Sequence, residues 1–299
     1  MKHSVAAVVV TYNRKNMLEN CIHALLEQTV ACDILIVDNG STDGTENMVK
    51  NWVLNDAIIY KNTQKNLGGA GGFNYGMKIA MNLGYEYIWL MDDDTYPNTD
   101  ALEKILEADS ILEGKYGFLS SVAYWRDGSV CNMNRQKTSL KRVVDRYDEK
   151  LIPVIMATFV SFFVKSEIVR QVGYPIKEFF IWSDDLEYSR RISRKYESYV
   201  VSNSHVLHDM TSNAKVGIEH ETPERLWRYE YLYRNEVYLY RREGLKGMLY
   251  LIMRIVLHLI RVLCKGKEGR IEKIRVIIQS FKSGFSFRPE IEMVEEKTW

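Results

Sequence analysis

Apolar and polar residues alternate in blocks along the first 120 residues, and the blocks have the lengths of strands and helices. Short apolar runs rich in β-branched residues occur at residues 5–11, 33–37, 57–60 and 87–91. Segments with helical periodicity follow them, at residues 15–28, 72–83 and 99–114 and in a segment that begins at residue 41 or 42. Strands separated by helix-length segments predict βαβ units, so we expect a Rossmann-like α/β domain with a mostly parallel sheet flanked by helices.

The pattern changes after residue 121. Residues 122–150 are mostly polar, which predicts an insertion or loop. Further on we expect a buried strand at residues 156–164, a helix at 184–195, a strand at 199–206 and helices from residue 222 to the end. The predicted organisation is therefore an α/β domain over residues 1–221, divided near residue 120, with a helical C-terminal extension over residues 222–299.

Composition narrows the class of protein. Of the 299 residues, 46% are hydrophobic and 26% are charged, values that exclude disordered and fibrous architectures. The formal net charge of +1 offers no chain-wide attraction for nucleic acid. The four cysteines have neither CxxC nor metal-ligand spacing, and the first residues lack a signal-peptide pattern. We therefore expect free thiols and an intracellular protein.

Polar residues follow three of the predicted strands: TYNR at residues 11–14, DNG at 38–40 and DDD at 92–94. Ligands of parallel sheets bind at the carboxyl ends of the strands. Within Asp92, Asp93 and Asp94, carboxylates at alternate positions can hold Mg²⁺ or Mn²⁺. The bound cation would bridge a diphosphate and would relieve the repulsion among the three carboxylates. The alternative is an acidic turn or helix cap.

Three other segments carry candidate chemistry. NLGGAGGF at residues 66–73 permits close backbone approach to a ligand, although a flexible turn would look the same. In WSDDLEY at residues 182–188, either one acid caps a helix or a carboxylate acts as a general base beside aromatic residues. Glu187 and Arg191 have the spacing of a helical ion pair. His208 is either structural or a third metal ligand.

Together, VVVTYNR (residues 8–14), DNGSTDGT (38–45), MDDD (91–94) and WSDDLEYSRR (182–191) resemble the family 2 glycosyltransferases of GT-A fold, over roughly residues 3–240. The resemblance implies an inverting enzyme that uses a nucleotide-sugar donor and a divalent cation. The chain is most similar to the galactofuranosyltransferase and rhamnosyltransferase branch. The glycine-rich block favours UDP-galactofuranose over dTDP-rhamnose as donor.

The resemblance also implies roles for individual residues. Asp185 would be the catalytic base, and Trp182 and Asp184 would contact donor or acceptor. The cation, Mn²⁺ or Mg²⁺, would be held by Asp92, Asp94 and His208. The nucleotide and donor sugar, in the half formed by residues 1–120, would be bound by Thr11, Tyr12, Asn13, Arg14, Asp38, Asn39, Asn66, Gly68, Gly69 and Asp93. Residues 121–221 would form the acceptor half.

The C-terminal extension is basic and amphipathic. Within the apolar residues 247–265, the side chains of Arg254, His258, Arg261 and Lys265 form one polar stripe, and the two arginines argue against a membrane-spanning helix. Between residues 246 and 288 the basic residues far outnumber Glu268 and Glu272. We expect these helices to lie on the inner face of the plasma membrane, near a glycan or lipid-linked acceptor of bacterial surface polysaccharide synthesis. The alternative is packing on the catalytic domain or on another subunit.

Two other classes of protein fit part of the pattern. A nucleotidyltransferase also uses paired carboxylates and Mg²⁺, but it needs a basic phosphate-gripping loop, of which Arg14 and Lys15 are a faint version. A non-catalytic sugar-nucleotide-binding protein would have no use for a base at Asp185. The sequence leaves the acceptor, the linkage, the identity of the ion and the formation of a homo-oligomer open.

Overall fold

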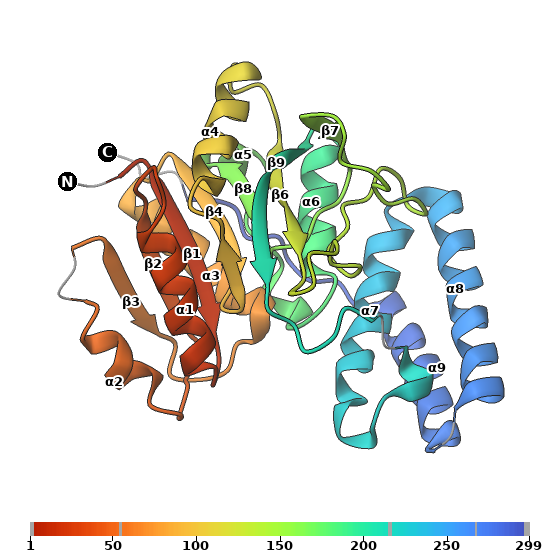
Figure 1. The fold of residues 1–299 in the computed structure, drawn as a ribbon. Helices are drawn as coiled ribbons and strands as arrows, with labels where there is room; N and C mark the ends of the chain where they lie inside the picture. The colour runs from red at the N-terminus through yellow and green to blue at the C-terminus, as the bar shows by residue number, and fades with distance from the viewer. Residues whose placement is uncertain (1–2, 54–55, 215–216, 267, 296–299) are drawn as a thin grey trace.

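A nine-stranded sheet forms the centre of the computed structural model, which describes residues 3–53, 56–214, 217–266 and 268–295 (Figure 1). The strands are ordered β3-β2-β1-β4-β8-β6-β9-β5, and β7 pairs with β9 beside this path. Three helices follow the α/β part at the C-terminal side of the molecule. The predicted fold class, α/β with a helical extension, is confirmed.

The first half of the sheet is parallel, as predicted. It consists of β1 (Val5–Thr11), β2 (Asp33–Asp38), β3 (Ile58–Asn62) and β4 (Tyr87–Asp92), joined by α1 (Lys15–Leu26), α2 (Thr45–Lys50) and α3 (Gly68–Leu83). Every residue of β1 and β2 is buried, because helices cover both faces of the sheet. The same burial explains why these strands are visible in the sequence as continuous apolar runs.

The second half of the sheet is mixed, which corrects the expectation of parallel strands. It contains β5 (Thr95–Pro97), β6 (Phe118–Tyr124), β7 (Leu151–Pro153), β8 (Phe162–Lys165) and β9 (Tyr199–His208). Strand β8 runs antiparallel to β4 and β6, and β9 runs parallel to β6 and antiparallel to β5 and β7.

Two predicted boundaries in this half are wrong, and one strand was not predicted. The loop expected from residue 122 begins only after β6, whose register shifts between Ser121 and Val122. The strand expected at residues 156–164 begins at Phe162, because Met156 is apolar for a different reason: it packs against helices of the C-terminal region. The short strand β5 has too few residues to show a pattern.

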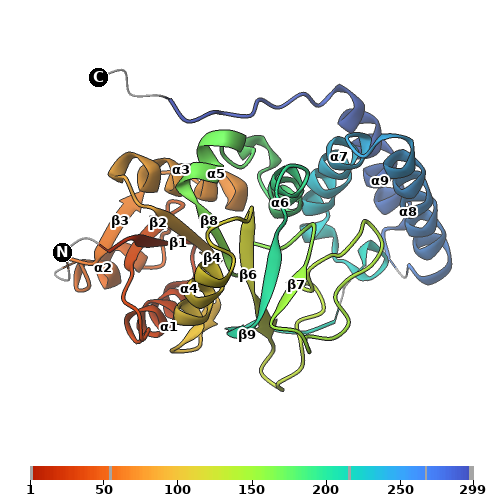
Figure 2. The same cartoon turned by 90° about the horizontal axis from the view of Figure 1, so that it is seen from above.

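Helices cover the sheet on both sides, and Figure 2 shows α3, α5 (Ser166–Val172) and α6 (Asp184–Ser193) on one face with α1 and α4 (Ala101–Ile111) on the other. Alternate residues of β1 face the two layers, so Val8 and Val10 pack with α3 and Ala7 and Val9 with α1. None of the four cysteines, all within the described residues, forms a disulfide.

The C-terminal helices α7 (Trp227–Arg241), α8 (Gly244–Lys265) and α9 (Arg270–Ser286) pack against one another. Short 3₁₀ turns lie before α6, at Lys177–Phe179 (η1), and before α7, at Ile218–His220 (η2) and Pro223–Arg225 (η3). The helices end at Ser286, so the expectation of helix to the end of the chain is wrong. Residues 287–295 are extended and run back over the α/β part (Figure 2). There Glu292 pairs with Lys78 and Lys177.

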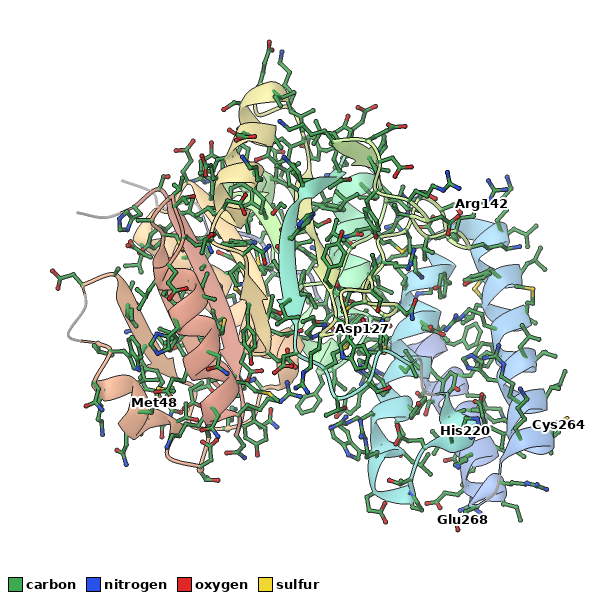
Figure 3. All side chains as sticks on the ribbon, in the orientation of Figure 1. Met48, Asp127, Arg142, His220, Cys264 and Glu268 are labelled. Atoms are coloured by element: carbon green, nitrogen blue, oxygen red, sulfur yellow. The ribbon has the colours of Figure 1, made fainter. Side chains whose placement is uncertain are left out.

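The orientation of α8 differs from the expectation. Arg254 pairs with Glu236 of α7 at 2.6 Å, and His258 lies 2.9 Å from the Tyr233 hydroxyl, so these members of the predicted polar stripe face inward. The outward face is apolar, and the side chains there point away from the rest of the molecule, as Cys264 does in Figure 3. It consists of Leu245, Leu249, Ile252, Met253, Val256, Leu257, Ile260 and Leu263, which are 44–77% exposed.

The length and composition of α8 also meet the requirements of a membrane span, and among the helices of the described residues α8 alone does so. Its most apolar stretch is 22% buried, because one side packs along α7. Length and composition are weak evidence for spanning, since core helices of other proteins meet the same criteria.

Candidate active site

Most of the predicted site residues gather at the carboxyl ends of β1, β2 and β4. There β1 ends at Thr11, β2 at Asp38 and β4 at Asp92, on the same edge of the parallel sheet. The antiparallel pairing of β5 with β9 places His208 opposite Thr95, the residue that follows Asp94. The register of the sheet thus brings His208 beside the acidic triplet, although they are far apart in sequence.

Asp92, Asp94 and His208 form a cluster in which one ligand atom from each lies within 4.8 Å of the others. Oδ1 of Asp94 is buried 3.2 Å from Nε2 of His208 and accepts no hydrogen bond from any residue that the structure describes. Burial lowers the pKa of His208, but Asp94 outweighs this effect and raises it to about 10. The cluster therefore attracts positive charge, and its oxygen and nitrogen ligands suit a hard divalent cation such as Mg²⁺ or Mn²⁺.

Asn134 orients this histidine, and the sequence analysis missed it. Its Oδ1 lies 2.9 Å from Nδ1 of His208, and its amide donates to the Thr158 hydroxyl. Because Nδ1 is directed at Asn134, Nε2 is the ring nitrogen that faces Asp94, and it would ligate a cation after losing its proton. Asn134 lies in the polar segment predicted to be a loop, where one asparagine among several gives no signal.

The remaining member of the triplet, Asp93, is tied to the end of β1. The Thr11 hydroxyl donates to Asp93 at 2.7 Å, and Nη1 of Arg14 lies 3.2 Å from Asp93 and 2.7 Å from Asp94. Burial raises the pKa of Asp93 to about 7 even though Arg14 lowers it. Burial also raises the pKa of Asp94, but His208 and Arg14 hold it below its usual value.

A cavity of about 410 Å³ opens beside the turn after β1, lined by Asn13, Arg14, Lys15, Asn16, Met17 and Asp43. Asn13 has a φ of +54° and accepts a 2.7 Å hydrogen bond from the backbone of Thr42, which joins the turns after β1 and β2. Tyr12 is 44% exposed. Asn13 and Arg14, two of the predicted donor-binding residues, therefore line a space that a ligand can enter.

Asp38 and Asn39 shape the turn after β2. The carboxylate of Asp38 is fully buried and accepts hydrogen bonds from the backbone of Ser41 and from the Tyr60 hydroxyl, at 2.8 and 2.6 Å. Asn39 donates to the carbonyl oxygen of Gly68 at 2.9 Å. Both residues connect the end of β2 to neighbouring segments.

The glycine-rich segment begins α3 instead of preceding it, four residues earlier than predicted. The backbone N–H of Gly68 donates to the side chain of Asn66, and with a φ of +71° this glycine lies so close to Phe180 that a Cβ would be 2.1 Å from its carbonyl oxygen. A Cβ at Gly72 would lie 2.5 Å from a methyl group of Val10. At Gly69, by contrast, no described atom lies within 4 Å of where a Cβ would be. Most of these glycines therefore serve close packing, and Gly69 leaves room for a ligand.

Asp184 and Asp185 begin α6 after a constrained loop in which Phe180, Trp182 and Ser183 have φ between +62° and +68°. Such values strain residues other than glycine. The buried amide of Asn235, on α7, donates to the carbonyl oxygens of Phe179 and Trp182 at 3.0 and 2.9 Å. Asn235 thus holds the loop in place, a role that sequence reasoning missed because its partners lie on another element.

The two carboxylates of α6 differ in environment. Asp184 is buried, and burial together with repulsion from Asp185 raises its pKa well above the usual value. Asp185 is half-buried, and burial raises its pKa to about 7, with a further contribution from the charge of Asp92. Because Asp92 affects both carboxylates, the start of α6 lies near the Asp92–Asp94–His208 cluster. Glu187 and Arg191 form the predicted ion pair, at 2.8 Å.

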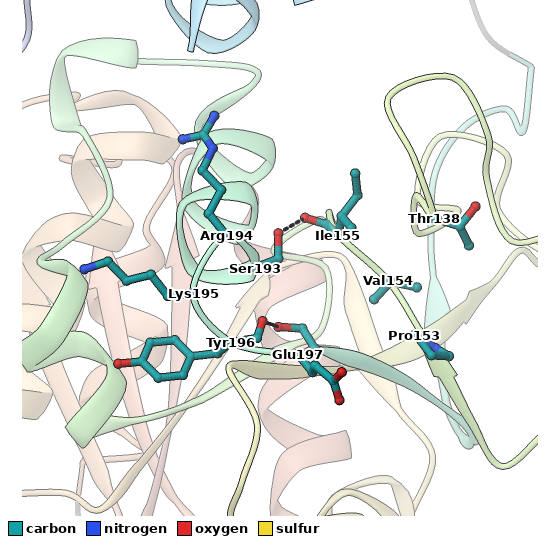
Figure 4. A pocket seen from close by; sticks show the side chains of 10 residues that line it. Thr138, Pro153, Val154, Ile155, Ser193, Arg194, Lys195, Tyr196 and Glu197 are labelled. Atoms are coloured by element: carbon teal, nitrogen blue, oxygen red, sulfur yellow. Dashed lines mark hydrogen bonds between the residues drawn. The ribbon is translucent and has the colours of Figure 1, made fainter. Parts of the chain in front are cut away.

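A second cavity, of about 330 Å³, is separate from this site (Figure 4). It is lined by Thr138, Pro153, Val154, Ile155, Ser193, Arg194, Lys195, Tyr196, Glu197 and Ser198. These residues include the C-terminal end of α6, about 15 Å from Asp184 at a rise of 1.5 Å per residue. None of them belongs to the predicted site.

Comparison with known proteins identifies the family. The model of "Glycosyl transferase family 2" matches residues 6–173, more than half of the chain. The galactofuranosyltransferases GlfT1 of Mycolicibacterium smegmatis and Mycobacterium tuberculosis H37Rv are 28% and 29% identical to the chain over 270 and 272 residues. These alignments cover 82% and 83% of this chain and 85% and 86% of theirs.

Solved structures show the same fold. GalNAc-T7 with UDP, GalNAc and Mn²⁺ superposes with a TM-score of 0.63 at 15% identity, covering 94% of this chain and 56% of that one. The mannosyltransferase PcManGT from Pyrobaculum calidifontis, in complex with GDP-Man and Mn²⁺, gives 0.55 at 15% identity, covering 96% and 74%. These structural likenesses establish the fold alone, and the family match adds the class of enzyme. The chain belongs to glycosyl transferase family 2 and is a glycosyltransferase of GT-A fold.

Proposed function

We propose that the protein is a metal-dependent inverting glycosyltransferase that transfers galactofuranose from UDP-galactofuranose to a glycan or lipid-linked acceptor of a bacterial surface polysaccharide. The observation that carries the proposal is the Asp92–Asp94–His208 cluster beside Asp185. The choice of sugar rests on the GlfT1 relatives, which match more than four fifths of the chain. dTDP-rhamnose is the second candidate donor. Family membership argues against the nucleotidyltransferase and the non-catalytic binding protein.

In this proposal Asp92, Asp94 and His208 hold Mn²⁺ or Mg²⁺, whose charge stabilises the departing diphosphate. Oδ1 of Asp94 is buried and faces His208 without accepting a hydrogen bond within the described residues, and Asn134 orients this histidine; both observations support the assignment. Arg14 reaches Asp93 and Asp94, so its guanidinium is near enough to contact the diphosphate as well. The nucleotide and sugar are bound by Thr11, Tyr12, Asn13, Asp38, Asn39, Asn66, Gly68, Gly69 and Asp93.

Asp185 is the proposed base. It removes the proton of an acceptor hydroxyl while that oxygen forms a bond to the anomeric carbon of the donor. The bond from this carbon to the diphosphate oxygen breaks at the same time, and its electron pair leaves with the nucleoside diphosphate. Attack from the opposite face inverts the anomeric centre. A carboxylate with a pKa of about 7 is well matched to this task, whereas the more buried Asp184 holds its proton more tightly. Asp184 and Trp182 are left to contact donor or acceptor.

We further propose that α8 lies at the cytoplasmic surface of the membrane with its apolar face in the lipid. An unpartnered face of eight large apolar side chains is unusual for a protein surface. Lys246, Arg261 and Lys265 are exposed near its ends and can contact anionic lipid headgroups. A lipid-linked acceptor would be available at the same surface.

Calorimetric titration of UDP and dTDP, with and without Mn²⁺, tests the proposed donor class. We expect UDP to bind in a metal-dependent manner and binding to be lost in Asp92→Ala and Asp94→Ala. A preference for dTDP would change the proposed donor to dTDP-rhamnose. If the wild-type protein binds neither nucleotide in the presence of Mn²⁺, the proposed function is wrong.

A further inference from the structure

The start of α7 carries an arginine whose charge the structure leaves unbalanced. Arg228 lies in the first turn of α7, and its Nε is buried without a hydrogen-bond acceptor. Across the described ranges of the chain, Arg228 makes no ion pair and donates no hydrogen bond, and its guanidinium carbon lies 5.5 Å from the ring centre of the exposed Trp227. A buried donor that is left without an acceptor destabilises the fold, and more so when the group is charged. Such a group calls for a reason other than stability.

The neighbouring charges add to the imbalance. Arg225, in η3, and Arg14, at the end of β1, both repel Arg228. The nearby acid Glu221 lies 3.5 Å from Nε of Arg225 and is therefore shared. Burial and these two arginines lower the pKa of Arg228 although Glu221 raises it. The region is therefore positive, next to an acidic cluster that would hold a cation.

The residues on either side of Arg228 contact the loop that leads into the proposed base. Trp227 packs edge-on against Phe180 at 6.1 Å, and Tyr229 packs edge-on against Trp182 at 5.1 Å. Arg14, whose charge repels that of Arg228, donates hydrogen bonds to Asp93 and Asp94. In Figure 1 the first turn of α7 lies on the side of the molecule toward which β1 and β4 point. Arg228 is thus within electrostatic range of Arg14, and its two neighbours contact the loop that precedes α6.

We propose that Arg228, together with Arg225, binds a phosphate group of a substrate. A guanidinium group forms paired hydrogen bonds with phosphate oxygens, and a phosphate would satisfy the buried Nε and reduce the repulsion among the arginines. The inference rests on the proposed function, because glycosyl transfer to a lipid-linked acceptor involves two phosphate-bearing molecules. One is the nucleoside diphosphate of the donor, and the other is a lipid phosphate attached to the acceptor glycan.

The position of α7 favours the acceptor. Its other side packs against α8, whose outward face is the apolar surface proposed to enter the lipid. A phosphate at the headgroup level could be reached from the start of α7 while the lipid chain stays in the membrane. The donor diphosphate, by contrast, has Arg14 and the acidic cluster as its own binding groups.

The test compares Arg228→Ala and Arg225→Ala with Arg146→Ala, which removes an exposed arginine outside the site. Calorimetry measures UDP with Mn²⁺, and then farnesyl diphosphate in the presence of saturating UDP and Mn²⁺. We expect Arg228→Ala to weaken the affinity for one of these ligands at least tenfold and Arg225→Ala to weaken the same one. Arg228→Lys should retain part of the affinity. Loss for farnesyl diphosphate alone identifies the acceptor as the source of the phosphate, and loss for UDP identifies the donor.

Thermal unfolding of the same variants separates ligand binding from a structural role. Because Arg228 forms no ion pair or hydrogen bond within the described residues, and otherwise contacts only the ring of the exposed Trp227, Arg228→Ala should change Tm little. A clear fall in Tm, or unchanged affinity for both ligands, would overturn the inference. Should Arg228→Ala fail to fold, the exposed Arg225 and the conservative Arg228→Lys still decide the outcome. Failure of the wild-type protein to bind UDP with Mn²⁺ would instead refute the proposed function, so the two failures are distinguishable.

Discussion

The α/β part and the C-terminal helices place their polar and apolar residues in opposite ways. In the α/β part, carboxylates gather without full compensation at one edge of the sheet, and exposed apolar side chains such as Leu83 and Ile111 are scattered. In the helical region, charges such as Arg254 and Glu236 are paired inside, and the apolar side chains of α8 line the outside.

This difference shows which kind of binding partner the α/β part and the helical region each lack. Burial and the charge of Asp94 raise the pKa of Asp92 to about 6, so the acidic edge is short of positive charge. In the helical region Arg254 and Glu236 balance each other inside, and what the outward face of α8 lacks is an apolar environment. The first part therefore needs a cation and a charged substrate, and the second needs a lipid surface.

The largest effect is expected from Asp185→Asn, which removes the proposed base but keeps its size. Turnover should fall about a thousandfold, since positioned bases contribute factors of this order, while UDP binding with Mn²⁺ stays nearly unchanged. Steady-state kinetics and calorimetry measure the two quantities. The exposed Asp148→Asn is the matched control. Turnover within a few fold of the wild type would remove Asp185 from the mechanism.

A variant of the outward face of α8 tests the other half of the comparison. Replacing Leu249, Ile252 and Val256 by serine should weaken binding to vesicles that contain anionic lipid by about a hundredfold, because each side chain loses roughly 1 kcal/mol of burial in the lipid. Co-sedimentation measures this affinity. Serine at Leu26, Leu83 and Ile111, exposed positions of the α/β part, should have no such effect.

If the α8 variant sediments like the wild type, the lipid does not contact this face. A change from dimer to monomer in the same variant, detected by analytical ultracentrifugation, would identify a second copy of the chain as the partner instead.

The pH dependence of kcat/KM gives a smaller effect. Asp185 accepts a proton only when it is unprotonated, and burial raises its pKa to about 7. The rate should therefore fall about tenfold per pH unit below pH 7 and level off above it. A cation beside Asp92 would weaken the repulsion and move the midpoint to lower pH. A profile that is flat from pH 5 to 8 would contradict the assignment.

The smallest effect is expected where residues 287–295 tie the two parts together. Burial raises the pKa of Glu292, but hydrogen bonds from Lys177, Lys78 and Asn74 outweigh this and lower it to about 2. The pairing stabilises the fold above the unfolded pKa and loses this contribution as the pH falls toward 2. Glu292→Gln should lower the free energy of unfolding by about 1 kcal/mol at pH 7 and by less at pH 3. The exposed Glu290→Gln is the control in denaturant titrations; equal effects of both variants would exclude a specific role for Glu292.

Local patterns in the sequence predicted much of the fold and part of the candidate site. The strands β1 to β4 were predictable because burial on both faces requires continuous apolar residues, and their polar ends marked the edge where Asp38 and Asp92 lie. The mixed half was less predictable. Its strands β5, β7 and β8 have only three or four residues each, and apolar residues such as Met156 are buried by distant helices and not by the sheet.

The sequence by itself determined the α/β architecture, the acidic triplet and the resemblance to a glycosyltransferase, because periodicity and motifs are properties of neighbouring residues. Only the tertiary structure decided that His208 meets Asp94, that Asn134 orients this histidine and that Asn235 holds the loop before Asp184. It also decided that Arg254 faces α7, which turns the apolar side of α8 outward. The physical reason is the same in each case: these contacts join residues distant in sequence, and the register of the sheet and the packing of the helices select them.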